Sequence, residues 1–512
     1  MTAPHRDEVV KLEASLRGLL AGPSTLSFLA DLAAQRGEPV YLVGGFLRDV
    51  LLGRSSDEVD LVSPRASELA AAWSRERGAR LVQIDRRFGS LRLIPPGAER
   101  MGAISSLDLS PLRGASILED LPCRDFTVNA TAVELVAWRS NGSLELIDPL
   151  DGLADLRAGQ LRACSSRSFA DDPLRLLRAY RFLASHPFRL EPGTEALIKG
   201  SARCLGDVAV ERVRDELSLI LESPRAARIF KMLDDGGVVR FLLPECEPMR
   251  GLEESGERHL DLWTSSLLTL KALEDLTARP EILFTGFAGE VNAILAERLA
   301  GTRTRSGVVK LAALLRDVAK PLCRKVGAGG AVHFHGHEVA GARMAAAICA
   351  RLRFSNQEIH EVSELVRQHM RVGHLLRLDP PTPRALSRFF RLGPTLFWPL
   401  LFLTAADDGA AREPRSAGAE PPRPRQQLAQ WLEFYHRELR PRQAGPALVS
   451  GHELMAALHL SPGPLVGRLL RAIGDLHWEG RISSRDEALQ EASRLLARWS
   501  PRERRSDASH AP

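Results

Sequence analysis

One stretch of the chain, residues 41–62, restricts its fold more than any other. It reads YLVGGFLRDVLLGRSSDEVDLV. Tyr41–Val43 predicts a short buried strand and Gly44–Gly45 a tight turn, followed by a helix over Phe46–Leu52. Val59–Val62 predicts a second strand. A strand, a glycine turn, a helix and another strand in so short a distance predict a mixed α/β unit.

Two acidic residues next to this second strand, Glu58 and Asp60, are candidates for chemistry. Residues two apart on a strand share a face, so both carboxylates point the same way while Val59 points to the other side. Adjacent carboxylates repel one another unless a cation lies between them, and Mg²⁺ prefers such oxygen ligands. Asp108, on another strand candidate, could complete a set that holds two ions for phosphoryl transfer. A solvated acidic edge is the alternative.

The glycine pair predicts a phosphate-binding turn. Without side chains at Gly44 and Gly45, backbone N–H groups can approach a triphosphate, helped by the positive N-terminus of the following helix. Arg48 lies one turn further along and could reach a phosphate. An ordinary turn is the alternative, because most glycine pairs bind nothing.

Periodicity divides the rest of the chain. Further strand candidates are Ala79–Ile84, Leu91–Pro95 and Ile104–Leu109. Beyond Ser165 the chain is almost wholly helical, with i, i+3, i+4 apolar spacing over Ser168–Ala184 and Val208–Leu221. We therefore expect an α+β protein. The expected divisions are an N-terminal helical segment at 1–35, a mixed-sheet head at 36–165, a helical neck at 166–245, a helical domain at 246–408, a Pro- and Arg-rich linker at 409–426, a helical tail at 427–500 and a disordered end at 501–512.

Charge and cysteine content limit the class of protein. The formal net charge of +5 suits a polyanionic partner, although a general bias toward arginine explains it equally well. The six cysteines form no CxxC pair, so neither a zinc ribbon nor a disulfide framework is indicated. An N-terminus unlike a signal peptide and the lack of a long apolar run predict a cytoplasmic protein without a membrane span.

Five motifs, in order over residues 42–216, resemble those of the class II tRNA nucleotidyltransferase and bacterial poly(A) polymerase family. The first joins the glycine turn to Glu58 and Asp60. The second, CRDFTVNA, resembles the family's RRDFTxNA. The others are IDPLDGLADL, DDPLRLLRAYRF and ERVRDE, which begin at Ile147, Asp171 and Glu211 and are similar to the family patterns DPxxGxxDL, EDPLRxLRAxRF and ERIRxE.

The resemblance implies a polymerase-β-like nucleotidyltransferase head with Mg²⁺ as cofactor. Its catalytic acids correspond to Glu58, Asp60 and Asp108, of which Glu58 and Asp60 hold the metal. Its nucleotide-binding residues correspond to Gly44, Gly45, Arg48, Arg124, Asp125, Asn129, Asp172, Arg175 and Arg178.

The fourth motif is implied to select the base. In the family an Asp and an Arg of this motif hydrogen-bond the incoming base in place of a template, and they match Asp172 and Arg175. We expect both residues on one helix and, being three apart, on one face, where one accepts and the other donates. An intrahelical salt bridge is the alternative.

Three residues depart from the family pattern. Glu58 replaces an Asp, and a carboxylate misplaced by about 1 Å can cost about 10²-fold in rate. Cys123 replaces the first Arg of the second motif and removes one cation. Asp171 replaces a Glu, which is a milder change.

Residues 311–369 resemble an HD phosphohydrolase domain in the segments LAALLRDVAKP, FHGHE and LVRQH. Arg316 stands where the His of the HD pair would be, and a guanidinium cannot ligate a metal. A further ligand His of that family is missing near Ser265. The candidate ligands that remain are Asp317, His337, His369 and Asp407. Because this set is incomplete, we expect a degenerate HD-like scaffold for RNA rather than a metal-dependent hydrolase.

Residues 451–489 resemble the C-terminal segment of long tRNA nucleotidyltransferases. A PGP turn precedes a basic amphipathic helix, from which Arg468 or Arg471 could bind an RNA backbone phosphate. Simple helix packing is the alternative.

Together the resemblances predict transfer of CMP or AMP from CTP or ATP to the 3′ end of tRNA, as full CCA addition or as partial A or CC addition. A poly(A) polymerase acting on other RNA shares all five motifs, although Phe88-Gly89 is more similar to the tRNA enzymes. A catalytically impaired RNA-binding paralogue is a further alternative, suggested by Glu58, Cys123 and Arg316. The sequence does not determine the oligomeric state.

Overall fold

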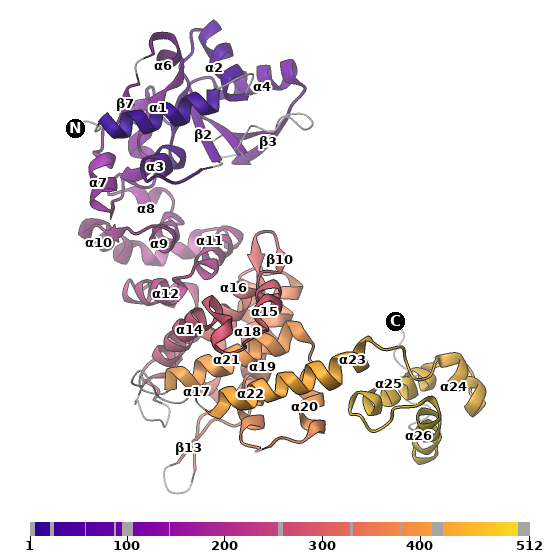
Figure 1. The fold of residues 1–512 in the computed structure, drawn as a ribbon. Coiled ribbons are helices and arrows are strands. Elements are labelled where there is room, and N and C mark those ends of the chain that lie inside the picture. The colour runs from indigo at the N-terminus through magenta and orange to yellow at the C-terminus, as the bar shows by residue number, and fades with distance from the viewer. Residues whose placement is uncertain are drawn as a thin grey trace. The chain divides into compact units, whose positions relative to one another are not determined.

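A computed structural model gives the fold of the chain, drawn as a ribbon in Figure 1. It describes residues 6–499 except 21–24, 57, 86–88, 95–105, 143, 254–259, 328–330, 379 and 412–422. Most of the predicted linker, the predicted disordered end and Phe88 therefore lie outside the described residues. The chain forms two compact units, which are Met1–Ile220 with Ile229–Pro244, and Leu221–Arg228 with Glu245–Pro512.

A seven-stranded mixed sheet forms the centre of the head. Its strand order is β3-β4-β5-β2-β1-β6-β7, and β2 and β5 are parallel while the other neighbours are antiparallel. The strands are β1 (Tyr41–Val43), β2 (Glu58–Ser63), β3 (Arg80–Asp85), β4 (Ser90–Ile94), β5 (Ser106–Pro111), β6 (Ala132–Glu134) and β7 (Leu146–Ile147). Each of the five predicted strands is present, and the α+β class is confirmed.

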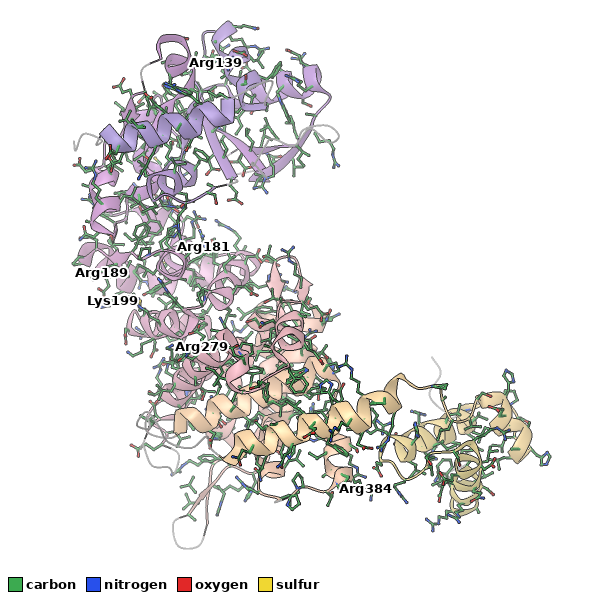
Figure 2. The ribbon with its side chains drawn as sticks, in the orientation of Figure 1. Arg139, Arg181, Arg189, Lys199, Arg279 and Arg384 are labelled. Carbon is green, nitrogen blue, oxygen red and sulfur yellow. The ribbon has the colours of Figure 1, made fainter. Side chains whose placement is uncertain are left out.

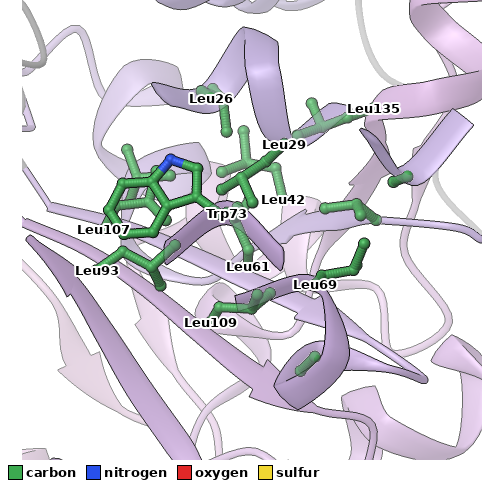
Figure 3. Close-up of a cluster of buried hydrophobic side chains, with 14 of the residues drawn as sticks. Leu26, Leu29, Leu42, Leu61, Leu69, Trp73, Leu93, Leu107, Leu109 and Leu135 are labelled. Atoms are coloured by element: carbon green, nitrogen blue, oxygen red, sulfur yellow. The ribbon is translucent and has the colours of Figure 1, made fainter. Parts of the chain in front are cut away.

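Four helices, together with Leu135 and Trp138, share one leucine-rich core on one face of this sheet. They are α1 (Arg6–Leu20), α2 (Thr25–Gln35), α3 (Gly45–Leu51) and α4 (Ala66–Arg77). Leu29 from α2 and Trp73 from α4 belong to the same buried cluster as Leu61 and Leu107 from the strands (Figure 3). Leu12 from α1 is part of this cluster too. A smaller cluster around Val43 and Leu121 lies apart from this core. The polar residues that alternate with the buried leucines along β2, β4 and β5 are therefore directed away from the main core.

The helical part of the first unit differs from the prediction at one point. Ser168–Ala184 is not one helix, because α8 (Ser168–Asp171) ends before Pro173 and α9 (Arg175–Ser185) begins after it. Proline disfavours a helical conformation in the preceding residue, and Asp172 is extended, with φ −148° and ψ 99°. The other helices here are α5 (Ile117–Asp120), α6 (Leu135–Asn141), α7 (Gly152–Ala158), α10 (Pro192–Ser201), α11 (Val210–Glu222), α12 (Ala226–Asp235) and α13 (Val239–Leu242).

The second unit is helical apart from two short hairpins. Its principal helices are α14 (Leu262–Ala278), α16 (Arg305–Leu315), α18 (His337–Arg351), α19 (Asn356–Leu376), α20 (Pro383–Phe390), α21 (Pro394–Ala411) and α22 (Arg423–Phe434), followed by α24 (Gly451–Leu458), α25 (Pro464–Trp478) and α26 (Arg485–Arg498). Helices α21 and α22 extend into both ends of the predicted linker. The last three helices share a small apolar core of their own.

No single helix of the described chain is long and apolar enough to cross a membrane. Only α20 and α21 taken together, bent by 112° at their junction, reach the required length and composition. Three large apolar residues of α21, Phe397, Trp398 and Phe402, are fully buried in the second unit.

Candidate active site

Three acids and one arginine lie close together on the sheet of the head. Asp60 on β2 is the register partner of Asp108 on the parallel strand β5, and Asp108 is the register partner of Arg92 on β4. Paired residues share a face of the sheet, and Glu58 precedes Asp60 by two residues on that face. Glu58 and Asp60 are exposed while Val59 is buried, as the sequence predicts.

The Asp60 carboxylate lies at the centre of this group. Although one side of it is open to solvent, the protein atoms around it raise its pKa; Arg124 opposes this rise, and repulsion from Asp108 and Glu58 adds to it. A divalent cation held by oxygen ligands would remove this repulsion. The donor set therefore fits an ion of the Mg²⁺ type, with Glu58, Asp60 and Asp108 as the residues that would hold it.

Asp108 is already paired with a cation from the chain. Arg92 donates from Nε to Oδ1 at 2.8 Å and from Nη2 to Oδ2 at 2.9 Å. The motifs do not indicate Arg92. Alternation with Leu91 and Leu93 indicates only that Arg92 points to the polar face of its strand, and its pairing with Asp108 depends on strand order and register.

The glycine turn lies directly beside Asp60. Gly44 has φ +80°, and a Cβ atom at this position would lie 3.1 Å from Asp60 Oδ2. Both the left-handed backbone and the close approach require glycine. Gly45 begins α3, so the N-terminus of that helix lies next to the cluster of acids formed by Glu58, Asp60 and Asp108.

Arg48 is placed differently from the other cations predicted to bind phosphate. Its guanidinium is buried, donates to Asn129 Oδ1 at 2.6 Å, pairs with Asp49 at 2.9 Å and lies over the ring of Phe182. Burial lowers its pKa against the opposing effect of Asp49. In this conformation the Arg48 guanidinium is held by protein groups and has a structural role next to the glycine turn.

A polar cavity of about 240 Å³ lies in the head-and-neck unit. It is lined by Arg113, Arg124, Asp125, Asp172, Arg175, Arg178 and Arg212. Five arginines against two aspartates make it suited to a polyphosphate. Arg124, Asp125, Asp172, Arg175 and Arg178 were predicted from the motifs, and the structure brings them together. Arg113 and Arg212 were missed; Arg212 lies inside the fifth motif, which could have indicated it.

Asp172 and Arg175 do not share a helix face, so that prediction is wrong. Asp172 lies in the break between α8 and α9 and pairs with Arg212 at 2.9 Å. Arg175 donates to the carbonyls of Cys123 at 2.7 Å and of Arg124 at 3.1 Å. Both side chains nevertheless line the same cavity, which Pro173 makes possible by ending the helix. The carbonyl, not the side chain, is the part of Cys123 that this contact uses.

Asp125 is the most firmly held acid of the cavity. Burial alone would raise its pKa, but Arg178 at 2.7 Å, Asn129 and the Phe126 N–H hold the pKa well below its usual range. Arg178 also lies 3.6 Å from Glu216 of the fifth motif.

The same Glu216 carboxylate pairs with Arg181 of α9 at 2.7 Å. Figure 2 labels Arg181 on the helices of the neck. The Glu216 ion pairs therefore connect α11 to α9, next to the arginines that line the cavity.

Replacing Asp125 by Asn should make the head less stable in a pH-dependent way. At pH 7 we expect a loss of about 2–3 kcal/mol in the free energy of unfolding, because a buried charged hydrogen-bond acceptor is lost. The pKa of Asp125 is lowered in the folded protein, and it is about 3.9 when unfolded. The stabilisation is therefore complete above that value and is lost as the pH falls through the folded pKa. Urea unfolding should show the difference from wild type persisting at pH 5 and shrinking below about pH 4; a difference that stays constant contradicts this.

Three family models match the chain. They are the poly A polymerase head domain over residues 40–162, the probable RNA and SrmB-binding site of polymerase A over 187–249, and the HD domain over 289–387. An A-adding tRNA nucleotidyltransferase of Deinococcus radiodurans is 34% identical over 465 residues, 90% of this chain and 95% of that protein. The chain belongs to the tRNA nucleotidyltransferase family.

Other members of this family are similarly related. A CC-adding tRNA nucleotidyltransferase of Thermus thermophilus is 34% identical over 455 residues, which are 88% of this chain and 92% of that protein. Among solved structures, a CCA-adding enzyme with CTP has a TM-score of 0.63 at 22% identity and covers 95% of this chain and 98% of its own. The Thermotoga maritima CCA-adding enzyme complexed with tRNA has a TM-score of 0.60 at 22% identity, over 94% of this chain and 98% of its own. These structures share the fold. The family is one of metal-dependent nucleotidyltransferases.

In the second unit, Arg316 lies at the centre of the HD-like site. The side chain is buried, with Nη2 2.7 Å from Asp407 Oδ1 and Nε 3.2 Å from Asp317 Oδ2. Nη2 also donates to Ser265 Oγ at 3.2 Å. The guanidinium thus provides a positive charge between two of the acids that remain from the HD ligand set.

The rest of that set also converges. In the part of the chain that the structure describes, Asp317, His337 and His369 are a group whose ligand atoms lie within 4.8 Å of one another, and all three are buried. Lys320 pairs with Asp317 at 3.0 Å, in addition to Arg316. Two cations on one carboxylate oppose a further cation there. The role of this domain as a scaffold for RNA stays a prediction.

The two arginines predicted for RNA binding in the tail differ in their surroundings. Arg468 lies over the ring of Trp499 at 4.2 Å, whereas Arg471 is exposed and donates to the Gly467 carbonyl within α25. Arg471 therefore presents its charge to solvent more openly than Arg468.

Proposed function

We propose that this chain transfers CMP or AMP from CTP or ATP to the 3′ end of tRNA, with Mg²⁺ as cofactor. The observation that carries the proposal is the carboxylate group of Glu58, Asp60 and Asp108 directly beside the Gly44 turn, in the same unit as a cavity lined by five arginines. The A-adding and CC-adding names of its relatives support tRNA as the acceptor.

Positioning and electrostatics would provide most of the catalysis. Glu58, Asp60 and Asp108 would hold divalent ions, which when bound stabilise charge on the attacking and leaving oxygens. The 3′ oxygen of the RNA forms the new bond to the α-phosphorus, and the bond to the pyrophosphate group breaks. Arg124 and Arg178 would neutralise charge on the triphosphate, and the Gly44–Gly45 backbone would approach it closely.

Base selection would use Asp172 and Arg175. Because Asp172 is paired with Arg212 and Arg175 donates to three carbonyls, an incoming base would have to exchange with these contacts. One acceptor and one donor lining the same cavity remain suited to reading a Watson–Crick edge.

Two alternatives are distinguished by one assay. Purified protein is incubated with Mg²⁺, labelled CTP or ATP, and tRNAs that lack CCA or end in C or CC. Addition that stops at CC, or at a single terminal A, identifies the partial enzymes, and completion of CCA identifies the full one. A long A tail on unrelated RNA indicates a poly(A) polymerase. Binding without incorporation, also in the Glu58→Asp variant, indicates an impaired paralogue.

The tail should contribute to RNA binding through Arg471. Arg471→Ala is expected to weaken tRNA binding several-fold and to reduce the slope of log affinity against log salt by about one, as for a single lost phosphate contact. Arg494→Ala on α26 removes the same charge from a side chain paired with Glu491 and serves as the control. Equal effects of the two substitutions on affinity and salt slope would assign the result to net charge.

A further inference from the structure

Arg92 is a cation in a group of acids that the proposed chemistry requires to bind other cations. It makes a two-pronged contact with both oxygens of Asp108, at 2.8 and 2.9 Å. Its charge also interacts with Glu58 and Asp60. Its position is fixed by the register of β4 against β5, which sets Arg92 opposite Asp108.

Two ion pairs of the same unit, Arg178–Asp125 and Arg92–Asp108, differ in their exposure to solvent and in the additional contacts that hold them. Arg178 and Asp125 have side chains 35% and 11% exposed, and Asp125 is held additionally by Asn129 and a backbone N–H. Arg92 is 41% exposed and Asp108 21%. The two guanidinium groups are almost equally exposed, so the difference lies in their partners. Arg178 also lies 3.6 Å from Glu216, and the less exposed Asp125 has further donors. The more exposed Asp108 can therefore exchange its cation at lower cost.

We propose that Arg92 is a positioning residue that acts as an exchangeable counter-cation for Asp108. Before the nucleotide arrives, Arg92 holds both oxygens of the Asp108 carboxylate and keeps it oriented toward the acids of β2. When a divalent ion binds there, Arg92 yields at least part of this contact, because two cations beside one carboxylate repel each other. Arg92 thereby weakens the binding of free metal ions. This inference rests on the proposed function, since it takes the acids of β2 and β5 to be the metal site.

Direct metal binding tests the proposal without measuring activity. Mn²⁺ binding to the full-length protein is measured by electron paramagnetic resonance in the absence of nucleotide, and the part that Asp60→Asn removes is assigned to the head. Arg92→Gln is expected to bind this Mn²⁺ about tenfold more tightly, the size of effect expected for loss of a charged hydrogen-bonded competitor. Arg92→Lys retains the charge and should stay close to wild type.

Two controls separate this role from a merely structural one. Arg75→Gln removes the same charge from α4, where Arg75 Nε donates to the Ala71 carbonyl, and should leave Mn²⁺ affinity unchanged. In an Asp108→Asn background, Arg92→Gln should matter much less, because the charged contact with Asp108 is already absent and only the weaker interaction of the Arg92 charge with Glu58 and Asp60 remains.

Each outcome decides between the claims. Unchanged or weaker Mn²⁺ binding by Arg92→Gln overturns the role of Arg92, provided that Asp60→Asn abolishes the head signal. Arg92→Lys binding as tightly as Arg92→Gln also overturns it, because charge would not be the cause. If Asp60→Asn leaves Mn²⁺ binding intact, the proposed active site itself is wrong.

Discussion

Asp60→Asn is expected to lower the rate of nucleotide addition by at least about 10³-fold while leaving the protein folded. Asp60 is the acid that lies between Glu58 on its own strand and Asp108 on the next. Asn keeps the shape of the side chain and removes its negative charge. The proposed metal site then loses the carboxylate that lies between those of Glu58 and Asp108. No neighbouring acid can replace it, because strand register fixes where each carboxylate lies.

Stability measurements distinguish this catalytic loss from misfolding. The pKa of Asp60 is raised in the folded protein, so its ionised form is disfavoured by folding at neutral pH. Asp60→Asn should therefore leave the unfolding temperature unchanged or raise it slightly. Asp31→Asn makes the same chemical change at an exposed residue paired with Arg139, and should retain activity. An Asp60→Asn protein within tenfold of wild-type activity would remove the chemical basis of the proposed function.

The strand-borne part of the site is predictable from sequence because its geometry follows from a period of two. Alternation alone places Glu58 and Asp60 on one face and Val59 on the other, as the structure has them. Arg92 is different. Its meeting with Asp108 depends on which strands are neighbours and in what register, and neither follows from the local pattern of β4.

The prediction that Asp172 and Arg175 lie on one helix was wrong for a local reason that can be seen in the sequence. Apolar spacing over Ser168–Ala184 favours one helix, but Pro173 lies inside that stretch and the residue before a proline avoids the helical conformation. Asp172 therefore leaves the helix and pairs with Arg212, some 40 residues later in the chain. Periodicity identifies the face of a helix well, and it misses a functional residue placed where the helix is interrupted.

In the HD-like site, the sequence shows what Arg316 cannot do, but not where its side chain lies. The chemistry of a guanidinium excludes Arg316 as a metal ligand. That Arg316 would instead lie between Asp317 and Asp407 depends on packing among α14, α16 and α21, which sequence alone does not give. The residue that removed a metal ligand has become an internal counter-ion.

Arg316→Ala is accordingly expected to destabilise the second unit by about 3–5 kcal/mol, as when one partner of a buried ion pair is removed. Asp317 would keep Lys320 but lose its second cation, and Ser265 and the Ala313 carbonyl would lose their hydrogen bonds to the guanidinium. For a unit of this size, such a loss corresponds to a fall of roughly 10 °C in the unfolding temperature.

Calorimetry of the full chain can test this with Arg351→Ala as a matched control. Arg351 makes a two-pronged contact with Glu245 in the same unit, at 2.8 and 3.1 Å, but its side chain is 40% exposed. Because solvent screens such a pair, its loss should cost at most about 1 kcal/mol. If the two substitutions lowered the unfolding temperature equally, burial would not govern the contribution of Arg316, and its role as the internal counter-ion of the HD-like site would have to be abandoned.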